Sequence, residues 1–393
     1  MTGGDNDTNN LQMLSLLLQC AEYISSNSAT ISDCYNLLLR INHLSSPYGS
    51  CPERVAAYFS DALRYRLIAS SSSVVVRNDH LKFLSSNAKR MLKIEKHRRI
   101  YQAFQHYNSM SPLVKFSHFT ANQAILEAVD GEESVHIVDL DIMQGLQWPG
   151  LFQILASRPN NVKMIKCFKI TGVGPSIELL EATGRRLSDF AAALEIKFEF
   201  CPVEGKISEI DDIGAILTGN EVTVVNWMQH RLYDSIGSDF DAIRIVKELQ
   251  PKLITIVNQD INTSLWFSFS RRFLEALRYY SALFDALSDT STVERGSLER
   301  HTVERQVFGC EIRNIMAMQY DIVTKVEGWG DKFSKHGFRQ VSLAGNPATQ
   351  ASLLLGMHPW KGYTLVEENG CLKLGWKDTS LLTATAWQPI SST

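Results

Sequence analysis

Glycine is scarce where this 393-residue chain would need it to bind a nucleotide. Residues 135–140 (VHIVDL) form a short apolar run rich in β-branched residues, which is typical of a strand buried on both faces of a parallel sheet. Rossmann-like folds place their ligand beyond such a strand end, against backbone that glycines leave bare. Here residues 141–144 (DIMQ) precede the first glycine, Gly145. The sequence therefore predicts a nucleotide-binding frame whose pocket is filled by side chains.

Several other features are missing. No CxxC pair or metal-ligand spacing occurs among the seven cysteines, so we interpret them as reduced intracellular thiols and expect no metal. No apolar run reaches about 18 residues, which argues against a transmembrane helix. The first ten residues (MTGGDNDTNN) are polar and acidic, unlike a signal peptide. We therefore expect a soluble protein of the cytosol or the nucleus, without membrane contact.

Catalytic signatures and a strong charge of one sign are also absent. We find no HExxH, GxSxG or Walker pattern. The formal net charge is −3 and the pI is about 6.4, whereas strongly cationic nucleic-acid-binding domains are basic. Any contact with DNA must therefore come from a local basic patch.

The pattern of apolar residues divides the chain into three parts. Residues 1–10 are predicted to form a short polar tail. Residues 11–130 repeat apolar side chains at three- and four-residue steps, with a break near Ser111-Pro112, and predict an all-helical cap. In residues 131–393, strand-like and helix-like stretches alternate, which predicts βαβ units and an α/β core with a parallel sheet.

A C-terminal hairpin completes the predicted core. The strands expected before it are Val135–Leu140, Cys167–Thr171, Lys197–Phe200, Val222–Trp227 and Leu253–Val257. Helical stretches such as Ile177–Leu194 and Asp239–Leu249 lie between them. Asn369-Gly370 separates two further apolar runs and predicts an antiparallel hairpin, with Leu381–Trp387 beside it. This is the arrangement of class I methyltransferases, whose first strand ends in a glycine-rich turn that this chain lacks.

Several motifs then point to a family. Val135–Asp139 (VHIVD) resembles the VHIID signature of the GRAS family of plant transcriptional regulators. The signature residues here are Val135, His136, Ile137, Val138 and Asp139. Three further matches are two leucine-rich regions (Leu11–Leu44 and Ile177–Leu194), the RE part of the PFYRE region (Glu304–Asn314) and the SAW motif (Trp329, Trp376 and Trp387). Longer segments, such as KFSHFTANQAI, are similar to the Scarecrow branch of this family.

The resemblance implies a methyltransferase-like core with an N-terminal helical cap, no known catalysis and no cofactor. It also implies a nuclear protein that forms heterodimers with GRAS proteins of the Short-root type. Zinc-finger transcription factors would be further partners and would carry the DNA contact. Two positions depart from the branch: Asn226 stands where it usually has His, and Asn258 where it usually has Glu. Both lie at the ends of predicted strands and are expected to face the filled pocket.

Four features in or near the predicted strands could carry chemistry. Residues 139–141 (DLD) could hold a divalent metal, but we expect the two carboxylates to cap the next helix. Residues 172–174 (GVG) lack the third glycine of a phosphate-binding turn, so nucleoside contact is the minor alternative. His136 is predicted to be a satisfied core histidine, whereas His230 could line a cleft.

Two sets of residues could contact partners. The LxxLL pattern at residues 14–18 can dock in a groove, although leucines at this spacing more often form core. The residues assigned to this partner interface are Leu14, Leu17, Leu18, Leu37 and Leu38. The second set could be a solvated helix face, a nuclear-import signal or acidic-partner site, or a DNA contact. Its residues are Lys89, Arg90, Lys93, Lys96, Arg98 and Arg99.

Taken together with the absent catalytic motifs, the resemblance implies a non-enzymatic transcriptional regulator that acts as a protein-interaction scaffold in plant development. Direct sequence-specific DNA binding is the first alternative, and the acidic net charge ranks it below bridging by a partner. A small-molecule methyltransferase is the second alternative, and the missing glycines argue against it. The tryptophans of the SAW-like motif are expected to pack the C-terminal sheet.

Overall fold

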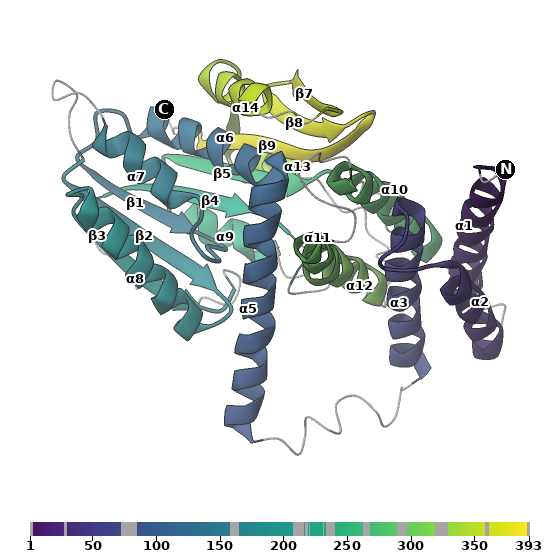
Figure 1. The fold of residues 1–393 in the computed structure, drawn as a ribbon. Helices are drawn as coiled ribbons and strands as arrows, with labels where there is room; N and C mark the ends of the chain where they lie inside the picture. Colours follow the sequence, from purple (N-terminus) through teal and green to yellow (C-terminus); the bar gives the residue numbers. More distant parts are fainter. Residues whose placement is uncertain are drawn as a thin grey trace.

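One nine-stranded sheet forms the centre of the molecule, and helices cover it (Figure 1). The structure is a computed structural model, and it describes residues 3–26, 30–71, 85–157, 165–206, 216, 219, 221–230, 232, 240–261, 268–288, 297–318, 329–357 and 361–390. None of the helices in these ranges is long and apolar enough to cross a membrane.

The order of the strands confirms the predicted methyltransferase-like core. The strands are β1 (Ser134–Asp139), β2 (Cys167–Gly174), β3 (Phe198–Glu204), β4 (Val222–Met228), β5 (Leu253–Gln259), β6 (Phe338–Val341), β7 (Tyr363–Glu368), β8 (Cys371–Trp376) and β9 (Thr379–Pro389). Their order is β3-β2-β1-β4-β5-β9-β8-β7, and β6 also pairs with β9. The first five run parallel, and β6 to β9 pair antiparallel. Only β6 was not predicted, because four residues are too few for a clear alternation.

The break predicted near Ser111-Pro112 separates two of the helices. The helices are α1 (Gly3–Ser26), α2 (Ile31–Leu44), α3 (Cys51–Ser71), α5 (Ser86–Met110), α6 (Pro112–Ala128), α7 (Trp148–Ala156), α8 (Ile177–Ala193), α9 (Phe240–Glu248), α10 (Phe269–Ser288), α11 (Leu298–Val303), α12 (Gly309–Ala317), α13 (Trp329–Lys335) and α14 (Asn346–Met357). A π-helical turn (Glu304–Phe308) joins α11 to α12. At the predicted break, the Ser111 hydroxyl accepts from the Leu113 N–H and Pro112 begins α6.

The boundaries of the cap differ from those expected. Helix α1 begins at Gly3, so residues 3–10 extend a helix instead of forming a polar tail. Helix α10 packs against α1 and α3, and helix α12 packs against α3, although both come from the range predicted as core (Figure 1). Helix α6 packs on β5 and β9, although it comes from the range predicted as cap. The sequence pattern missed this exchange because helical periodicity shows which face is buried but not the element that covers it.

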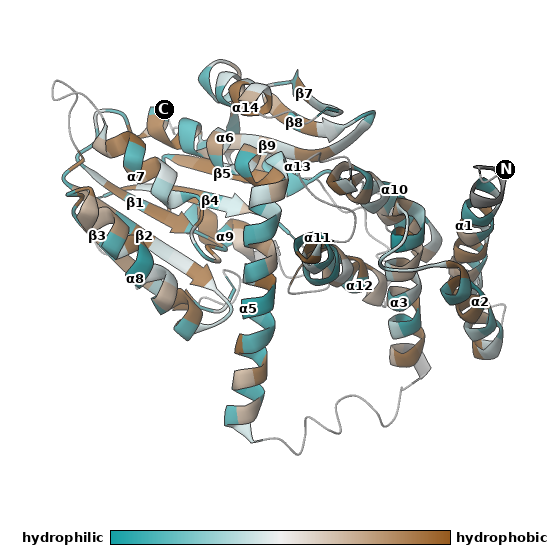
Figure 2. Cartoon of the chain, in the orientation of Figure 1, coloured by the Kyte–Doolittle hydropathy of each residue, from teal (hydrophilic) through white to brown (hydrophobic). Residues whose placement is uncertain are grey.

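Apolar residues cover both faces of the parallel strands. Figure 2 shows hydrophobic colours along β1 and neighbouring strands. On one face, Ile137 and Val224 join a cluster that continues into the cap helices. On the other face, Val138 and Val225 join a separate cluster that includes Trp387. Burial on both faces explains why the strands are continuous apolar runs.

Helix α8 approaches the sheet closely at a glycine. A Cβ atom placed on Gly184 would lie 2.3 Å from Cδ1 of Phe200 in β3, so the helix can pack here only because residue 184 lacks a side chain. Gly150 in α7 offers a contrast, because a Cβ atom there would meet nothing within 4 Å.

We expect Gly184→Ala to lower the free energy of unfolding by about 1–3 kcal/mol, because the added methyl group overpacks the contact with Phe200. The matched control, Gly150→Ala, is expected to raise it by up to about 1 kcal/mol through helix propensity alone. Urea denaturation of the purified protein followed by circular dichroism measures both. Equal effects of the two substitutions would show that the contact between α8 and β3 does not constrain the fold.

Candidate functional site

The loop after β1 lies at the carboxyl end of the sheet, where Rossmann-like folds bind their ligand. Ile142 in this loop occupies the space beside Gly172 of β2: a Cβ atom at residue 172 would lie 2.8 Å from Cγ2 of Ile142. Gly174 is covered in the same way by Leu180 of α8. These glycines therefore admit side chains of the chain itself, and the minor alternative of nucleoside contact at residues 172–174 is not supported.

A hydrogen bond from helix α8 also holds the loop after β1. Thr183 in α8 donates from Oγ1 to the backbone carbonyl oxygen of Met143, at 2.9 Å. Met143 has a positive φ of 47°, a conformation that non-glycine residues rarely adopt. The contact with α8 therefore stabilises a backbone shape that directs the side chains of the loop into the site.

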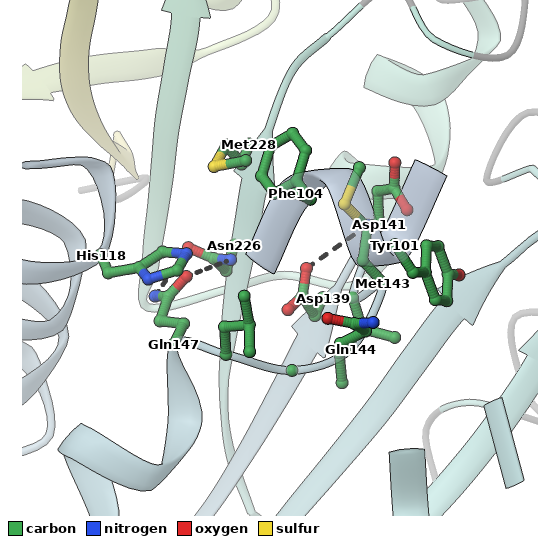
Figure 3. Close-up of a pocket in the computed structure, with 13 residues that line it drawn as sticks. Tyr101, Phe104, His118, Asp139, Asp141, Met143, Gln144, Gln147, Asn226 and Met228 are labelled. Carbon is green, nitrogen blue, oxygen red and sulfur yellow. Dashed lines mark hydrogen bonds between the residues drawn. The ribbon is translucent and has the colours of Figure 1, made fainter. Parts of the chain in front are cut away.

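A polar network centred on Gln147 fills the adjacent strand ends, and Figure 3 shows its contact between Gln147 and Asn226. Its side-chain amide donates to Oδ1 of Asn122 in α6 at 3.0 Å and to Oδ1 of Asn226 in β4 at 3.3 Å. Asn226 donates back to Oε1 of Gln147 at 3.3 Å, and Thr255 in β5 donates to Asn226 at 3.0 Å. All four side chains are buried, so the network links α6 and two strands across the former ligand site.

Asp139 accepts hydrogen bonds but does not cap the next helix, which corrects our expectation. Its Oδ2 accepts from the indole Nε1 of Trp148 at 3.0 Å, and its Oδ1 accepts from the backbone N–H of Asp141 at 3.3 Å. Helix α7 begins only at Trp148, and its N-cap residue, Gln147, makes no side-chain hydrogen bond to the helix end. Burial first, and then the charge of Asp141, raise the pKa of Asp139 to about 7.

Asp141 and His230 form an ion pair between the β1 loop and the end of β4. Burial alone would lower the pKa of His230, but the charge and hydrogen bond of Asp141 raise it above its ordinary value. His230 also lines a second cavity of about 40 Å³, which agrees with the expected position beside a cleft. Within the described ranges, no group of three or more His, Cys, Asp or Glu residues could hold a metal ion.

The space left at the strand ends is small. The cavity in Figure 3, lined by the residues of the β1 loop with Tyr101 and Phe104 of α5, has a volume of about 30 Å³. Pockets for drug-sized ligands and cofactors measure roughly 300–1,000 Å³. The residues present therefore do not fit a nucleoside-bearing methyl donor, and the cavity has room for one or two water molecules.

The other signature residues serve the core. Val135, Ile137 and Val138 are buried in the sheet. His136 is also buried, with its Nε2 2.8 Å from Oγ1 of Thr171, as expected for a satisfied core histidine. Burial first, and then the charge of Lys169, lower the pKa of His136 to about 4.

The leucines assigned to the partner interface separate into two groups. Leu17, Leu37 and Leu38 are buried in the chain's own core and are therefore not available to a partner, contrary to their assignment to the partner interface. Leu18 is half-buried, and only Leu14 is exposed, with 42% of its surface accessible. Most of these leucines therefore pack the core, which is the alternative that their spacing also allowed.

The six basic residues lie on one helix, α5, and all are exposed. Arg90 pairs with Glu178 in α8, and Arg99 pairs with Glu95 one turn earlier. The structure brings these cations together on α5, but they lie outside the cavities at the strand ends.

Trp376 in β8 and Trp387 in β9 pack the C-terminal part of the sheet, as expected, whereas Trp329 packs against Trp227 of the parallel strand β4. Trp376 is buried, and its Nε1 donates to Oδ2 of Asp285 in α10 at 2.7 Å. Trp387 stacks on Phe333 with ring centroids 5.5 Å apart. The ring centroids of Trp329 and Trp227 lie 4.7 Å apart.

Sequence reasoning missed the side chains that close the site most tightly. Gln147 and Asn122 lie in stretches with no recognisable chemical motif, so only their proximity in the fold shows their role. Asn226 had been singled out as a departure from the family pattern, and that departure was a usable signal. Asn258, the other departure, is half-buried and lines neither cavity.

Comparisons with known proteins agree with this geometry. The GRAS domain family matches residues 13–388. The chain is 53% identical to Scarecrow-like protein 23 of Arabidopsis thaliana over 379 residues, which cover 96% of this chain and 90% of that protein. It is 49% identical to protein SCARECROW of the same plant over 388 residues, covering 98% of this chain and 57% of that protein. A crystal structure of SCL7 in Oryza sativa matches with a TM-score of 0.74 and 30% identity, covering 96% of this chain and 99% of that one.

The fold and the closed strand ends together define a methyltransferase-like protein whose ligand site is occupied by its own side chains. The chain belongs to the GRAS family, a family of plant transcriptional regulators, and it is similar to the Scarecrow members. It spans just over half the length of protein SCARECROW.

The raised pKa of Asp139 predicts a specific dependence of stability on pH. The folded state holds the proton up to about pH 7 and the unfolded state releases it near its ordinary value, so stability falls as pH rises between these values. For one such group, the free energy of unfolding falls by at most about 1.4 kcal/mol per pH unit. We expect Asp139→Asn to remove this decline, which urea denaturation at several pH values measures.

Asp189→Asn is the matched control, because Asp189 is an exposed aspartate on α8. It should leave the wild-type pH dependence unchanged. Parallel curves for wild type and Asp139→Asn would contradict the assignment of a buried, protonated carboxyl to Asp139.

Proposed function

We propose that this chain is a non-enzymatic, nuclear regulator of transcription that acts as a protein-interaction scaffold. It pairs with another GRAS protein, of the Short-root type, and contacts DNA mainly through zinc-finger factors. The observation that carries this proposal is a closed ligand site combined with apolar side chains left exposed on the cap. A protein of this kind can bind partners at its surface but has no cavity for a substrate.

The closed site supports the non-enzymatic part. A methyltransferase needs a cavity for a nucleoside and a sulfonium centre, and the cavity here measures about 30 Å³. Ile142 and the Gln147 network would both have to move before a cofactor could enter. Such a movement would break the three buried hydrogen bonds of the Gln147 side chain, and each unmade bond of this kind costs about 1–3 kcal/mol.

The first two helices support the pairing part. Leu11 and Leu14 in α1 are 69% and 42% exposed, and Leu39 in α2 is 57% exposed. Large apolar side chains grouped on a surface mark contact sites with other proteins. Since the neighbouring leucines Leu17 and Leu38 are buried, α1 and α2 are firmly packed on one side and available on the other.

Direct DNA binding remains the second candidate, because six cations are exposed on one helix. The formal net charge of −3 favours the bridging role, since it opposes a general attraction to phosphate. The two functions differ in a gel shift with the protein alone. Direct binding requires a salt-dependent shift that is lost when Lys93, Arg98 and Arg99 are neutralised.

We expect Leu14→Glu to weaken pairing with a Short-root-type GRAS domain at least tenfold while leaving the fold intact, because Leu14 is exposed. Size-exclusion chromatography with light scattering measures the pairing, and circular dichroism checks the fold. Leu353→Glu in α14 is the matched control, since Leu353 is an exposed leucine outside the cap helices. If wild type and partner eluted as separate monomers, the scaffold proposal would be wrong. Leu17 is unsuitable for this test, because a charge there would disrupt the buried core.

The closed site makes a second prediction. We expect no binding of S-adenosylmethionine by isothermal titration calorimetry at millimolar ligand, because the strand ends have no space for the nucleoside. A catalytically competent methyltransferase of similar fold serves as the positive control. Stoichiometric heat would contradict the non-enzymatic assignment and revive the methyltransferase alternative.

A further inference from the structure

The first turns of α5 carry an exposed stripe that the fold and the proposed pairing do not use. Lys89, Leu92, Lys93 and Lys96 occupy positions i, i+3, i+4 and i+7, so they share one face of the helix. All four are exposed, and 52% of Leu92 is accessible. We call these four residues the α5 stripe.

The stripe lies on the part of α5 that packs least. The buried residues of this helix begin at Ile94 and continue to Met110, where α5 contacts α6 and α11. Figure 1 shows the N-terminal part of α5 extending away from the sheet and from the cap helices. Figure 2 shows hydrophilic and hydrophobic colours mixed along it. A helix end with an exposed leucine and no packing role is a surface that another chain can cover.

The charges on the stripe are not neutralised within the described part of the chain. No acidic partner of Lys89, Lys93 or Lys96 is found there, while the nearby Glu95 pairs with Arg99 at 3.1 Å. Arg90 pairs with Glu178 on the side of α5 that faces α8. The stripe therefore presents three positive charges around one apolar side chain.

We propose that the α5 stripe binds an acidic, unstructured peptide segment in which Asp or Glu alternates with large apolar residues. Carboxylates of the segment pair with the three lysines, and one apolar side chain covers Leu92. This composition is typical of acidic activation segments of transcription factors, and naming that class rests on the proposed function. The stripe would then recruit a second regulator to the scaffold.

The central leucine favours a peptide over DNA. Phosphate contacts need only the lysines, and an exposed leucine gains nothing from a phosphate backbone. An acidic peptide with apolar residues matches both the charge and the apolar centre of the stripe. Peptide binding therefore requires the side chain of Leu92, whereas DNA binding does not.

The test measures fluorescence anisotropy of a labelled synthetic peptide, in which Asp and Glu alternate with Leu and Phe, against the full chain. We expect Lys93→Glu combined with Lys96→Glu to weaken binding on the order of tenfold, because each exposed ion pair contributes up to about a factor of five. Leu92→Ser should weaken it about fivefold through lost apolar contact. Raising the salt concentration should weaken binding as well.

Matched controls lie on the same helix. Arg98 and Met91 are exposed and are placed roughly opposite the stripe, at about 100° per residue. Arg98→Glu and Met91→Ser should therefore leave the affinity unchanged. Loss of binding in these controls as large as in the stripe variants would overturn the proposal, and so would the absence of binding by wild type.

Two further measurements distinguish the alternatives. If the chain bound only double-stranded DNA, and Leu92→Ser bound it as well as wild type, the stripe would be a phosphate contact and the proposal would fail. Pairing with the Short-root-type domain, measured by light scattering, should be unchanged in all stripe variants. If the chain pairs normally but does not bind the peptide, only the proposed role of the α5 stripe is refuted. If it binds the peptide but does not pair, only the scaffold proposal is refuted.

Discussion

The network around Gln147 is the constraint on which the rest of the site depends. One buried amide links Asn122 of α6 to Asn226 of β4, and Thr255 of β5 completes the connection. These are the strand ends at which an open α/β sheet would bind its ligand. Because every partner is buried, an unpaired member would cost about 1–3 kcal/mol, so the network is stable only when it is complete. The sheet thus keeps the architecture of an enzyme while its ligand end serves as an internal joint between helices and strands.

A second joint holds the cap together. Arg54 of α3 and Glu304 of the π-helical turn form an ion pair at 3.0 Å, with both side chains almost completely buried, and Arg300 approaches the same carboxylate at 3.6 Å. Burial first, opposed by the two arginines, raises the pKa of Glu304 to about 7. Breaking a buried pair of this kind costs about 3–5 kcal/mol, so it fixes α3 relative to α11 and α12. Sequence segments 250 residues apart therefore form one rigid helical unit.

The sequence predicted the strands, the hairpin and the filled pocket, because these depend on local patterns. An apolar run between turns identifies β1 and β4, and Asn369-Gly370 identifies the hairpin of β7 and β8. The exchange of helices between cap and core could not be predicted in this way, since amphipathic helices look alike whichever element covers them. The same limit applies to Gln147 and Arg54, whose partners are distant in sequence. The prediction that Asp139 caps the next helix was wrong. Its carboxylate accepts from the indole N–H of Trp148 instead of from the backbone N–H groups at the start of that helix.

The leucines of α1 divide between the core and the surface. Leu17 is 2% exposed and belongs to the core, while Leu14, three residues earlier, remains on the surface. A helix with apolar residues on more than one face must bury the second face against something, and the described part of this chain leaves it open. The buried ion pair between α3 and the π-helical turn anchors the helical unit on which that face is displayed. In the proposed pairing, little chain entropy would then be lost when a partner covers the open face, and this preorganisation lowers the cost of association.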